Sequence, residues 1–228
     1  MIFKFFADIF FPPRCLACGK GVREGALCAP CRASITIYRT LFCGKCARRL
    51  FGDKANCHPD FPYLLGATGK YGNKALTSLI HSLKFRGGIS AADPLADLLV
   101  EYASSLGTLL NDCLVIPIPL SKERRRTRGF NQSELIAKSF AERFGLTCET
   151  ACLARIRHAK PQSETKSVAE RKENIRGVFA VTRRSAIAGK NIILVDDVTT
   201  SGATFLEAAR ELKSAGAERI IALAVARA

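Results

Sequence analysis

The sequence is short of acidic residues, has no apolar run long enough to cross a membrane, and contains no low-complexity segment. Its 228 residues include 20 Asp and Glu against 35 Lys and Arg, which gives a formal net charge of +15. A content of 48% hydrophobic residues excludes long disordered regions and predicts one globular domain with a small appendage. The charge predicts either polyanionic partners or a solvated basic surface without a specific partner. Such partners include nucleic acid, an anionic membrane face and a phosphorylated small molecule.

The first residues lack the features of an export signal. The stretch MIFKFFADIFFPP is interrupted by Lys4 and Asp8 and has no small-residue cleavage site. It is also shorter than the roughly twenty apolar residues of a membrane span, so we expect no transmembrane segment. The pattern is typical of an amphipathic helix that packs on the protein or rests on a membrane surface. We expect a cytoplasmic protein, with peripheral association at the inner face of the membrane as the alternative.

Seven of the ten cysteines lie between Cys15 and Cys57. In a protein that is not exported, paired cysteines hold metal rather than disulfides. Four thiolates with the spacing C-x2-C-x9-C-x2-C predict a tetrahedral zinc site. These first-set ligands are Cys15, Cys18, Cys28 and Cys31. Because so small a segment cannot build a sufficient core alone, we expect the zinc to be structural.

A second set of cysteines is less complete. It offers the thiolates of Cys43, Cys46 and Cys57, with His58 or Asp60 as the fourth ligand. Adjacent residues such as Cys57 and His58 do not always face one metal ion. The sequence therefore leaves open whether this half binds a second zinc ion or is a packed hairpin without metal.

Pro59 and Pro62 mark the end of the cysteine-rich region. We assign residues 1–62 to an N-terminal segment and zinc ribbon, and residues 63–228 to a second domain. In this domain, apolar runs predict strands at 66–71, 113–118, 178–181, 191–195 and 219–225. Helical spacing and helix-start signals predict helices at 73–85, 91–105, 131–144 and 203–214. This alternation predicts an α/β fold with a parallel sheet flanked by helices.

The segment IILVDDVTTSGAT, residues 192–204, predicts a site for a sugar phosphate. An apolar strand delivers Asp196 and Asp197 to its carboxyl end, and a loop of hydroxyl-bearing and small residues leads into a helix. Backbone amides of such a loop and the helix N-terminus bind anions, and Gly202 allows close approach. Carboxylates would repel a phosphate, so they fit hydroxyl groups or a metal ion on the same ligand. The loop lacks the lysine of a P-loop and the GxGxxG pattern of dinucleotide sites.

The chain resembles the ComF family, competence-associated proteins that join a zinc ribbon to a type I phosphoribosyltransferase domain. The stretches that carry the resemblance are CLACGKGV, LIHSLKF at 79–85, VIPIPL at 115–120, RTRGFNQSELIA at 126–137, RKENIRGVF at 171–179 and VDDVTTSGAT at 195–204. They are spread over nearly the whole chain. The resemblance implies a type I phosphoribosyltransferase-like sheet that binds phosphoribosyl pyrophosphate (PRPP) together with Mg²⁺.

The resemblance also implies roles for individual residues. Asp196 and Asp197 would form the catalytic pair that holds the ribose hydroxyls, directly or through Mg²⁺. The 5′-phosphate would be bound by Thr199, Thr200, Ser201, Gly202, Ala203 and Thr204. The turn at 119–128 would bind pyrophosphate, with contacts from Leu120, Ser121, Arg125 and Arg128. The basic stretch 155–176 would be a hood over the site, in which His158 is either a general acid–base or incidental.

Three functions fit these residues. The first is an enzyme that transfers phosphoribose from PRPP to a nitrogen acceptor. The second is an adaptor that binds single-stranded DNA for the DNA-uptake machinery in natural transformation. The third is a PRPP sensor. Arginines at 124–128 suit a diphosphate, and the surplus suits DNA phosphates. Aromatic residues do not interleave with these arginines, which argues against a base-stacking platform. We favour a PRPP-dependent transferase that also supports DNA uptake.

Overall fold

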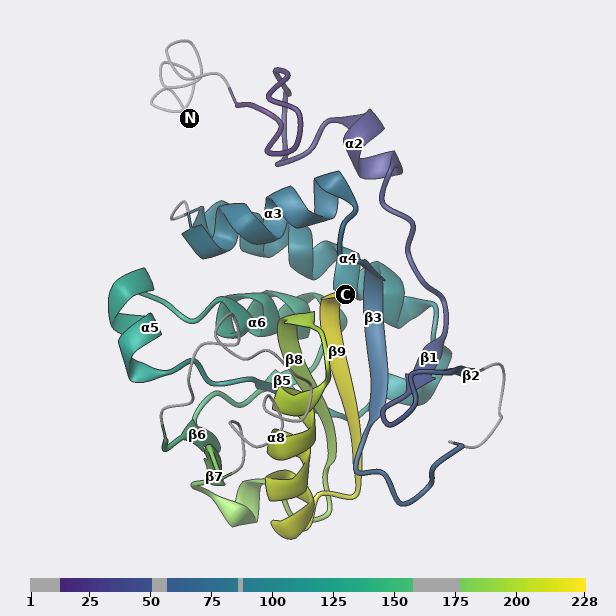
Figure 1. The fold of residues 1–228 in the computed structure, drawn as a ribbon, viewed down its shortest axis with the longest axis vertical. Coiled ribbons are helices and arrows are strands. Elements are labelled where there is room, and N and C mark those ends of the chain that lie inside the picture. Colours follow the sequence, from purple (N-terminus) through teal and green to yellow (C-terminus); the bar gives the residue numbers. More distant parts are fainter. Residues whose placement is uncertain (1–12, 51–56, 86–87, 158–176) are drawn as a thin grey trace.

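The main structural element is a seven-stranded sheet with the strand order β2-β1-β3-β9-β8-β4-β5. The computed structural model describes residues 13–50, 57–85, 88–157 and 177–228 (Figure 1). The strands are β1 (Leu41–Cys43), β2 (Arg49–Leu50), β3 (Leu64–Lys70), β4 (Leu114–Pro117), β5 (Thr147–Cys148), β8 (Asn191–Thr199) and β9 (Arg219–Arg227). Neighbours from β3 to β5 in this order run parallel, while β1 is antiparallel to both β2 and β3. The predicted α/β fold with a mostly parallel sheet is confirmed.

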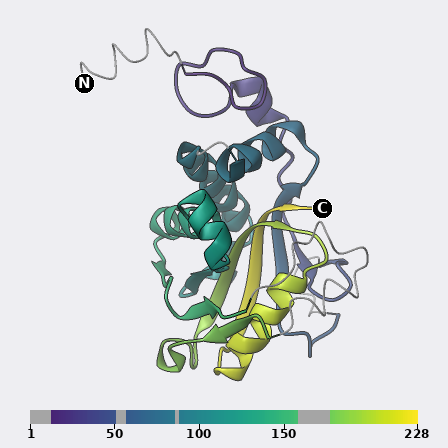
Figure 2. The same ribbon diagram turned by 60° about the vertical axis from the view of Figure 1, so that its left-hand side comes forward.

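Helices cover both faces of the sheet, and each face has its own hydrophobic core (Figures 1 and 2). One face packs on α3 (Lys74–Phe85), α4 (Ala92–Ser104) and α6 (Gln132–Phe144), and the other packs on α8 (Ala203–Ser214). Strand β8 shows the alternation, since Ile193 and Val195 enter the first core and Ile192 and Leu194 the second. Because both faces of the sheet are covered, apolar residues follow one another along β8 without alternating with polar ones.

Several predicted elements agree closely with the structure. Helix α8 has the predicted bounds, α3 and α6 each begin one residue later than predicted, and α4 is one residue shorter at each end. The start of α6 was marked by Asn131, whose side chain accepts a hydrogen bond from the amide of Ser133 at 3.2 Å. Its amide group also donates to the carbonyl of Ile118 at 3.0 Å, which ties the end of β4 to this helix. Short 3₁₀ helices lie at Ile89–Ala91, Gly107–Leu110 and Arg184–Ala186.

Other elements differ from prediction. Strand β8 continues through Asp196 and Asp197 to Thr199, because it pairs with β9 over this whole length. The predicted strand at 178–181 is β7 (Phe179–Val181), but it forms a separate antiparallel pair with β6 (Leu153–Arg155). The predicted turn at 119–128 contains a short helix, α5 (Lys122–Arg128), which ends at Gly129 in the left-handed region. Strands as short as β5 and β6 give no readable periodicity.

The two halves of the cysteine-rich region occupy different places (Figure 1). The first half, with α2 (Ala29–Ala33), lies above α3 and α4, where Arg32 forms an ion pair with Glu101. The second half forms the hairpin of β1 and β2, which extends the main sheet beyond β3 through the pairs of Phe42 with Leu65 and Cys43 with Leu64. Among the described residues, no helix combines the length and apolar character that a membrane crossing requires. The predicted amphipathic segment lies in residues 1–12, outside those described.

Gly66 in β3 supplies a test of the packing between the sheet and α4. A Cβ atom at this position would lie 2.4 Å from Cδ2 of Leu223 and 3.0 Å from the ring of Tyr102. We expect Gly66→Ala to lower the free energy of unfolding by about 1–3 kcal/mol, the usual cost of overpacking a core. Urea denaturation measures this. Gly21→Ala is the control, because nothing lies within 4 Å of its Cβ position, and equal effects of both changes would contradict the prediction.

Candidate phosphate site and cysteine clusters

Asp196 and Asp197 lie near the carboxyl end of β8 and are held by two different helices. Oδ1 of Asp196 accepts hydrogen bonds from Oγ of Ser133 in α6 at 2.7 Å and from the amide of Asp197 at 2.9 Å. Asp197 is 4% exposed, and its Oδ2 lies 3.0 Å from Nζ of Lys84 near the end of α3. Contacts from α6 and α3 therefore position the two carboxylates.

The acid pair is electrostatically unfavourable in this form of the protein. Desolvation raises the pKa of Asp196 to about 7, and the neighbouring charge of Asp197 adds to the shift. Although the ammonium of Lys84 is close, Oδ2 of Asp197 accepts no aligned hydrogen bond from the described residues. A buried carboxylate oxygen in this condition fits a ligand that brings hydroxyl donors or a cation.

The loop after β8 has the features of an anion site. Gly202 adopts φ of +71° immediately before α8, and Thr199 is 5% exposed. Oγ of Ser201 is buried and has no hydrogen-bond partner among the described residues. The loop and Asp196 line a small hollow at the start of α8, where helical amides lack intrahelical acceptors. Its lining includes Thr199, Thr200, Ser201, Gly202, Ala203 and Thr204. An unpartnered hydroxyl in this place fits a phosphate oxygen.

Beside the acid pair lies a cavity of about 460 Å³ between α3 and α5. It is lined by Lys84, Phe85, Glu123, Arg124, Thr127, Arg128 and Phe130. The guanidinium of Arg128 lies 5.4 Å from the ring centre of Phe85 and donates to Gln132 at 3.0 Å. Burial lowers the pKa of Arg128, while the charge of Asp197 acts in the opposite direction. The cavity thus presents more positive than negative side chains next to the carboxylates.

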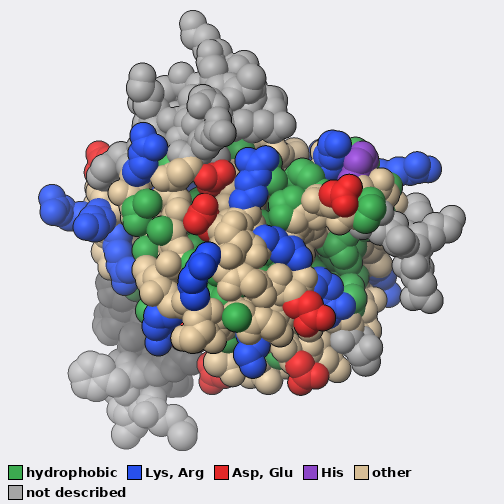
Figure 3. Space-filling view, turned by 90° about the horizontal axis from the view of Figure 1, so that it is seen from below, with side chains coloured by type: hydrophobic (Ala, Val, Ile, Leu, Met, Phe, Trp, Pro, Cys, Tyr) green, Lys and Arg blue, Asp and Glu red, His purple; other side chains and the backbone are tan. Residues whose placement is uncertain are grey.

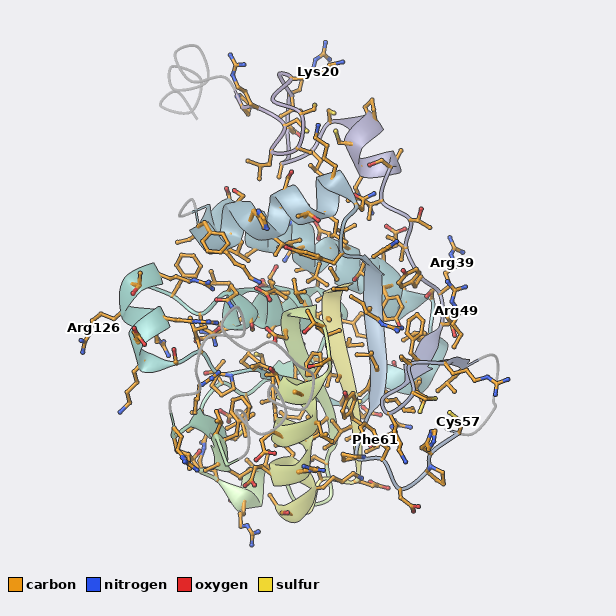
Figure 4. The ribbon with its side chains drawn as sticks, viewed as in Figure 1. Lys20, Arg39, Arg49, Cys57, Phe61 and Arg126 are labelled. Atoms are coloured by element: carbon orange, nitrogen blue, oxygen red, sulfur yellow. The ribbon has the colours of Figure 1, made fainter. Side chains whose placement is uncertain are left out.

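The other residues predicted to bind pyrophosphate do not line this cavity. Arg125 is mostly exposed and lies 3.6 Å from the carboxylate of Glu134. Ser121 caps α5 by accepting a hydrogen bond from the amide of Arg124 at 3.3 Å, and Leu120 is half-buried beside it. Arg126 projects away from the rest of the molecule on the outer side of α5 (Figure 4).

Sequence reasoning missed the role of Lys84. Its helix was predicted, and the stretch LIHSLKF was noted as part of the family resemblance, but nothing local indicates that the ammonium reaches Asp197, more than a hundred residues away. In the predicted hood, Arg155 lies in β6 with its guanidinium 5.7 Å from the ring centre of Phe179. His158 and the rest of the hood to residue 176 lie outside the described residues.

The first cysteine set forms a compact cluster. The sulfur atoms of Cys15, Cys18, Cys28 and Cys31 all lie within 4.8 Å of one another. Cys18 and Cys28 are 3.6 Å apart. With zinc–sulfur bonds of about 2.3 Å, a tetrahedral site has sulfur–sulfur distances of roughly 3.8 Å. The donor set and its spacing therefore fit the zinc ion predicted from the sequence.

The second cluster brings His58, and not Asp60, together with the three thiolates. Cys43, Cys46, Cys57 and His58 bring their ligand atoms within 4.8 Å of one another. Nδ1 of His58 lies 3.3 Å from Sγ of Cys43 and 3.4 Å from Sγ of Cys57, so the adjacent residues Cys57 and His58 do face the same point. Asp60 is not part of the group. Three thiolates and one imidazole form a donor set that suits structural zinc.

Comparisons with known proteins agree with this organisation. Residues 6–59 match the double zinc ribbon domain family, and residues 130–228 match the phosphoribosyl transferase domain family. The chain is 29% identical to the DNA utilization protein YhgH of Salmonella typhimurium over 90% of this chain and 86% of that protein. It is 27% identical to Competence protein F of Haemophilus influenzae over 96% of this chain and 99% of that protein.

A third relative is Competence protein ComFC of Bacillus subtilis, with 32% identity over 63% of this chain and 56% of that protein. All three similarities extend beyond either matched domain. The chain therefore joins a double zinc ribbon to a phosphoribosyltransferase domain, and over most of its length it is similar to ComF-type proteins named for competence and DNA utilization.

Proposed function

We propose that this protein binds PRPP with Mg²⁺ and transfers its phosphoribosyl group to a nitrogen acceptor, in support of DNA uptake or use. The observation that carries the proposal is an acid pair, with Asp197 buried and Asp196 half-buried, next to a loop whose Ser201 hydroxyl has no partner among the described residues. Among the described residues, Oδ2 of Asp197 has the ion pair with Lys84 but no aligned hydrogen bond, and the hydroxyl of Ser201 has no hydrogen-bond partner. A ligand with both a diol and a phosphate satisfies both groups at once.

Each part of the site has a role in this reaction. The loop from Thr199 to Thr204 binds the 5′-phosphate, and Asp196 and Asp197 accept hydrogen bonds from the ribose hydroxyls and so orient the anomeric carbon. The acceptor nitrogen forms a bond to this carbon with its lone pair and loses a proton. The bond from the carbon to the pyrophosphate oxygen breaks, and its electron pair leaves with the pyrophosphate.

Positive charge near the leaving group favours this displacement. Arg124, Arg128 and Lys84 line the neighbouring cavity and face a departing pyrophosphate. Mg²⁺ bound with PRPP would be held by the acid pair and would neutralise charge on the diphosphate. The ammonium of Lys84 also contacts Asp197, so this side chain connects the acid pair with the cavity.

A second candidate is a non-catalytic adaptor for single-stranded DNA, or a PRPP sensor whose zinc ribbon contacts a partner. The observations that favour it are the names of the relatives and the net charge of +15. Lys and Arg side chains are spread over the face in Figure 3 among acidic ones, while Arg39 and Arg49 project outward on the side of the β1–β2 hairpin (Figure 4). Pyrophosphate release separates the transferase from both alternatives. DNA binding that weakens steeply with salt separates the adaptor from the sensor.

The first test is calorimetric titration with PRPP and Mg²⁺. We expect micromolar-range binding by the wild type, and a loss of at least about tenfold in Asp196→Asn/Asp197→Asn, because hydrogen bonds to charged groups contribute about 1.5–3 kcal/mol each. Asp93→Asn/Asp97→Asn is the matched control, since these exposed acids pair with Arg143 away from the site. A folded, zinc-loaded wild type that does not bind PRPP would refute the proposal.

The acid pair also predicts how stability depends on pH. Asp196 loses its proton near pH 4 in the unfolded chain but near pH 7 in the folded protein, so the stability it contributes at low pH is lost as pH rises between these values. Asn at this position keeps the oxygen that accepts from Ser133 but removes the charge. We therefore expect Asp196→Asn to raise the Tm of the ligand-free protein at pH 8, with a smaller gain at pH 5. A Tm at pH 8 equal to or below that of the wild type would contradict this.

Metal content provides a separate test of the two clusters. We expect the purified protein to contain two zinc ions per chain, and Cys18→Ser and Cys57→Ser each to contain one fewer. Both cysteines are exposed, so the serine itself creates no packing defect. Atomic emission spectroscopy measures the content. Loss of metal in Cys18→Ser but not in Cys57→Ser would show that only the first cluster holds zinc.

A further inference from the structure

Tyr63 touches both the second cysteine–histidine cluster and the phosphate loop. The residue directly precedes β3 and is 2% exposed. Its hydroxyl lies 3.5 Å from the carbonyl oxygen of Gly44 and 3.4 Å from the carbonyl oxygen of Gly202. Gly44 lies in the turn between the ligands Cys43 and Cys46, and Gly202 opens α8. One side chain therefore connects a metal-binding turn with the loop that the proposed function assigns to the 5′-phosphate.

The hydroxyl of Tyr63 is poised between these two carbonyls. A phenol has a single proton, so it donates to only one of them at a time. Burial raises the pKa of Tyr63, so the group stays a donor at physiological pH. Both oxygen–oxygen distances exceed the 2.5–3.0 Å of a good O–H···O hydrogen bond. A small movement of either turn therefore decides which carbonyl receives the bond.

The backbone of both turns is closely packed against Tyr63 and its neighbour Phe61. A Cβ atom on Gly44 would lie 2.4 Å from the carbonyl oxygen of Tyr63 and 2.8 Å from the ring of Phe61. A Cβ atom on Gly202 would lie 2.6 Å from the Tyr63 hydroxyl. The ring of Tyr63 also packs on Phe205 in the first turn of α8, with ring centres 6.1 Å apart. Packing this close transmits a displacement instead of absorbing it.

A second connection reaches the other end of the loop. Nη1 of Arg227 donates to the carbonyl of Ala47, directly after the same metal-binding turn, at 3.4 Å, and its guanidinium lies 4.9 Å from the ring centre of Phe42. In the sheet, Arg227 is the registered partner of Thr199, and the next amide, of Ala228, donates to the carbonyl of Thr199 at 2.9 Å. The turn thus contacts neighbours of both ends of the loop.

We propose that Tyr63 is a positioning residue for the phosphate loop, and that metal bound by Cys43, Cys46, Cys57 and His58 sets the affinity of this loop for a sugar phosphate. Metal fixes the turn that carries Gly44. This turn then fixes the position of Gly202 through Tyr63 and the position of Thr199 through Arg227. The hydroxyl of Ser201, which lies between these two ends, is then held ready for the ligand. The inference rests on the proposed function of the loop, and linkage requires it to be reciprocal, so that the sugar phosphate tightens metal binding by the same factor.

The first arm of the test removes the hydroxyl alone. Tyr63→Phe in the full-length, zinc-loaded protein should weaken binding of ribose 5-phosphate, measured by calorimetry, by about threefold to tenfold, as expected for one hydrogen bond. Tyr102→Phe is the matched control. It removes another buried tyrosine hydroxyl, which donates to the carbonyl of Thr40 at 2.8 Å and not to a carbonyl of the phosphate loop or of the turn at Gly44. We expect this control to bind ribose 5-phosphate as the wild type does.

The second arm changes the metal. Cys57→Ser should weaken ribose 5-phosphate binding, whereas Cys18→Ser, which removes an equally exposed ligand of the first cluster, should not. If Cys57→Ser does not fold, the reciprocal measurement replaces it. Competition with a chromogenic chelator should show that ribose 5-phosphate tightens zinc binding in the wild type but not in Tyr63→Phe. A merely structural tyrosine would not produce this difference.

The outcomes separate the two proposals. If the folded, zinc-loaded wild type does not bind ribose 5-phosphate or PRPP, the proposed function fails and the coupling fails with it. If the wild type binds, but Tyr63→Phe binds equally well and zinc affinity does not respond to the sugar phosphate, the coupling is wrong while the proposed function stands.

Discussion

The parallel pairing of β8 with β9 is the interaction on which the rest of the site depends. It runs in register from Asn191 and Arg219 to Thr199 and Arg227. This pairing places the acid pair near the carboxyl end of β8 and sets where the phosphate loop begins. It also places Arg227 beside the second cysteine–histidine cluster. Because both strands are buried on both faces, any slip in register would move apolar side chains out of two cores at once.

The acid pair is stabilised only in part by its surroundings. Ser133 and Lys84 offset some of the cost of placing two adjacent carboxylates in a largely desolvated site, yet the raised pKa of Asp196 indicates that an unfavourable interaction remains. Groups that lower the stability of the folded protein are typical of binding sites, where residues are selected for their contacts with a ligand and not for stability. The unpartnered hydroxyl of Ser201 belongs to the same pattern.

The parts of the structure that follow from local sequence were predictable. Helix α8 and the first cysteine cluster are encoded by the apolar period and by C-x2-C spacing over a few residues. The parts that depend on distant partners were not. The extension of β8 to Thr199 depends on pairing with β9. The ion pair of Lys84 with Asp197 joins the end of α3 to the end of β8, which are far apart in the sequence. The spacing of the cysteines also did not show that the side chains of Cys57 and His58 face the same point, since this depends on the local backbone conformation.

The hairpin of β1 and β2 has a consequence for the solubility of the protein. It pairs with Leu64 and Leu65 at the start of the seven-residue strand β3, and just before the hairpin the amide of Tyr38 donates to the carbonyl of Thr68 further along the same edge. Exposed edges of this kind recruit strands from other chains. The cysteine-rich region therefore also occupies part of a sheet edge that could otherwise pair with a strand of another chain.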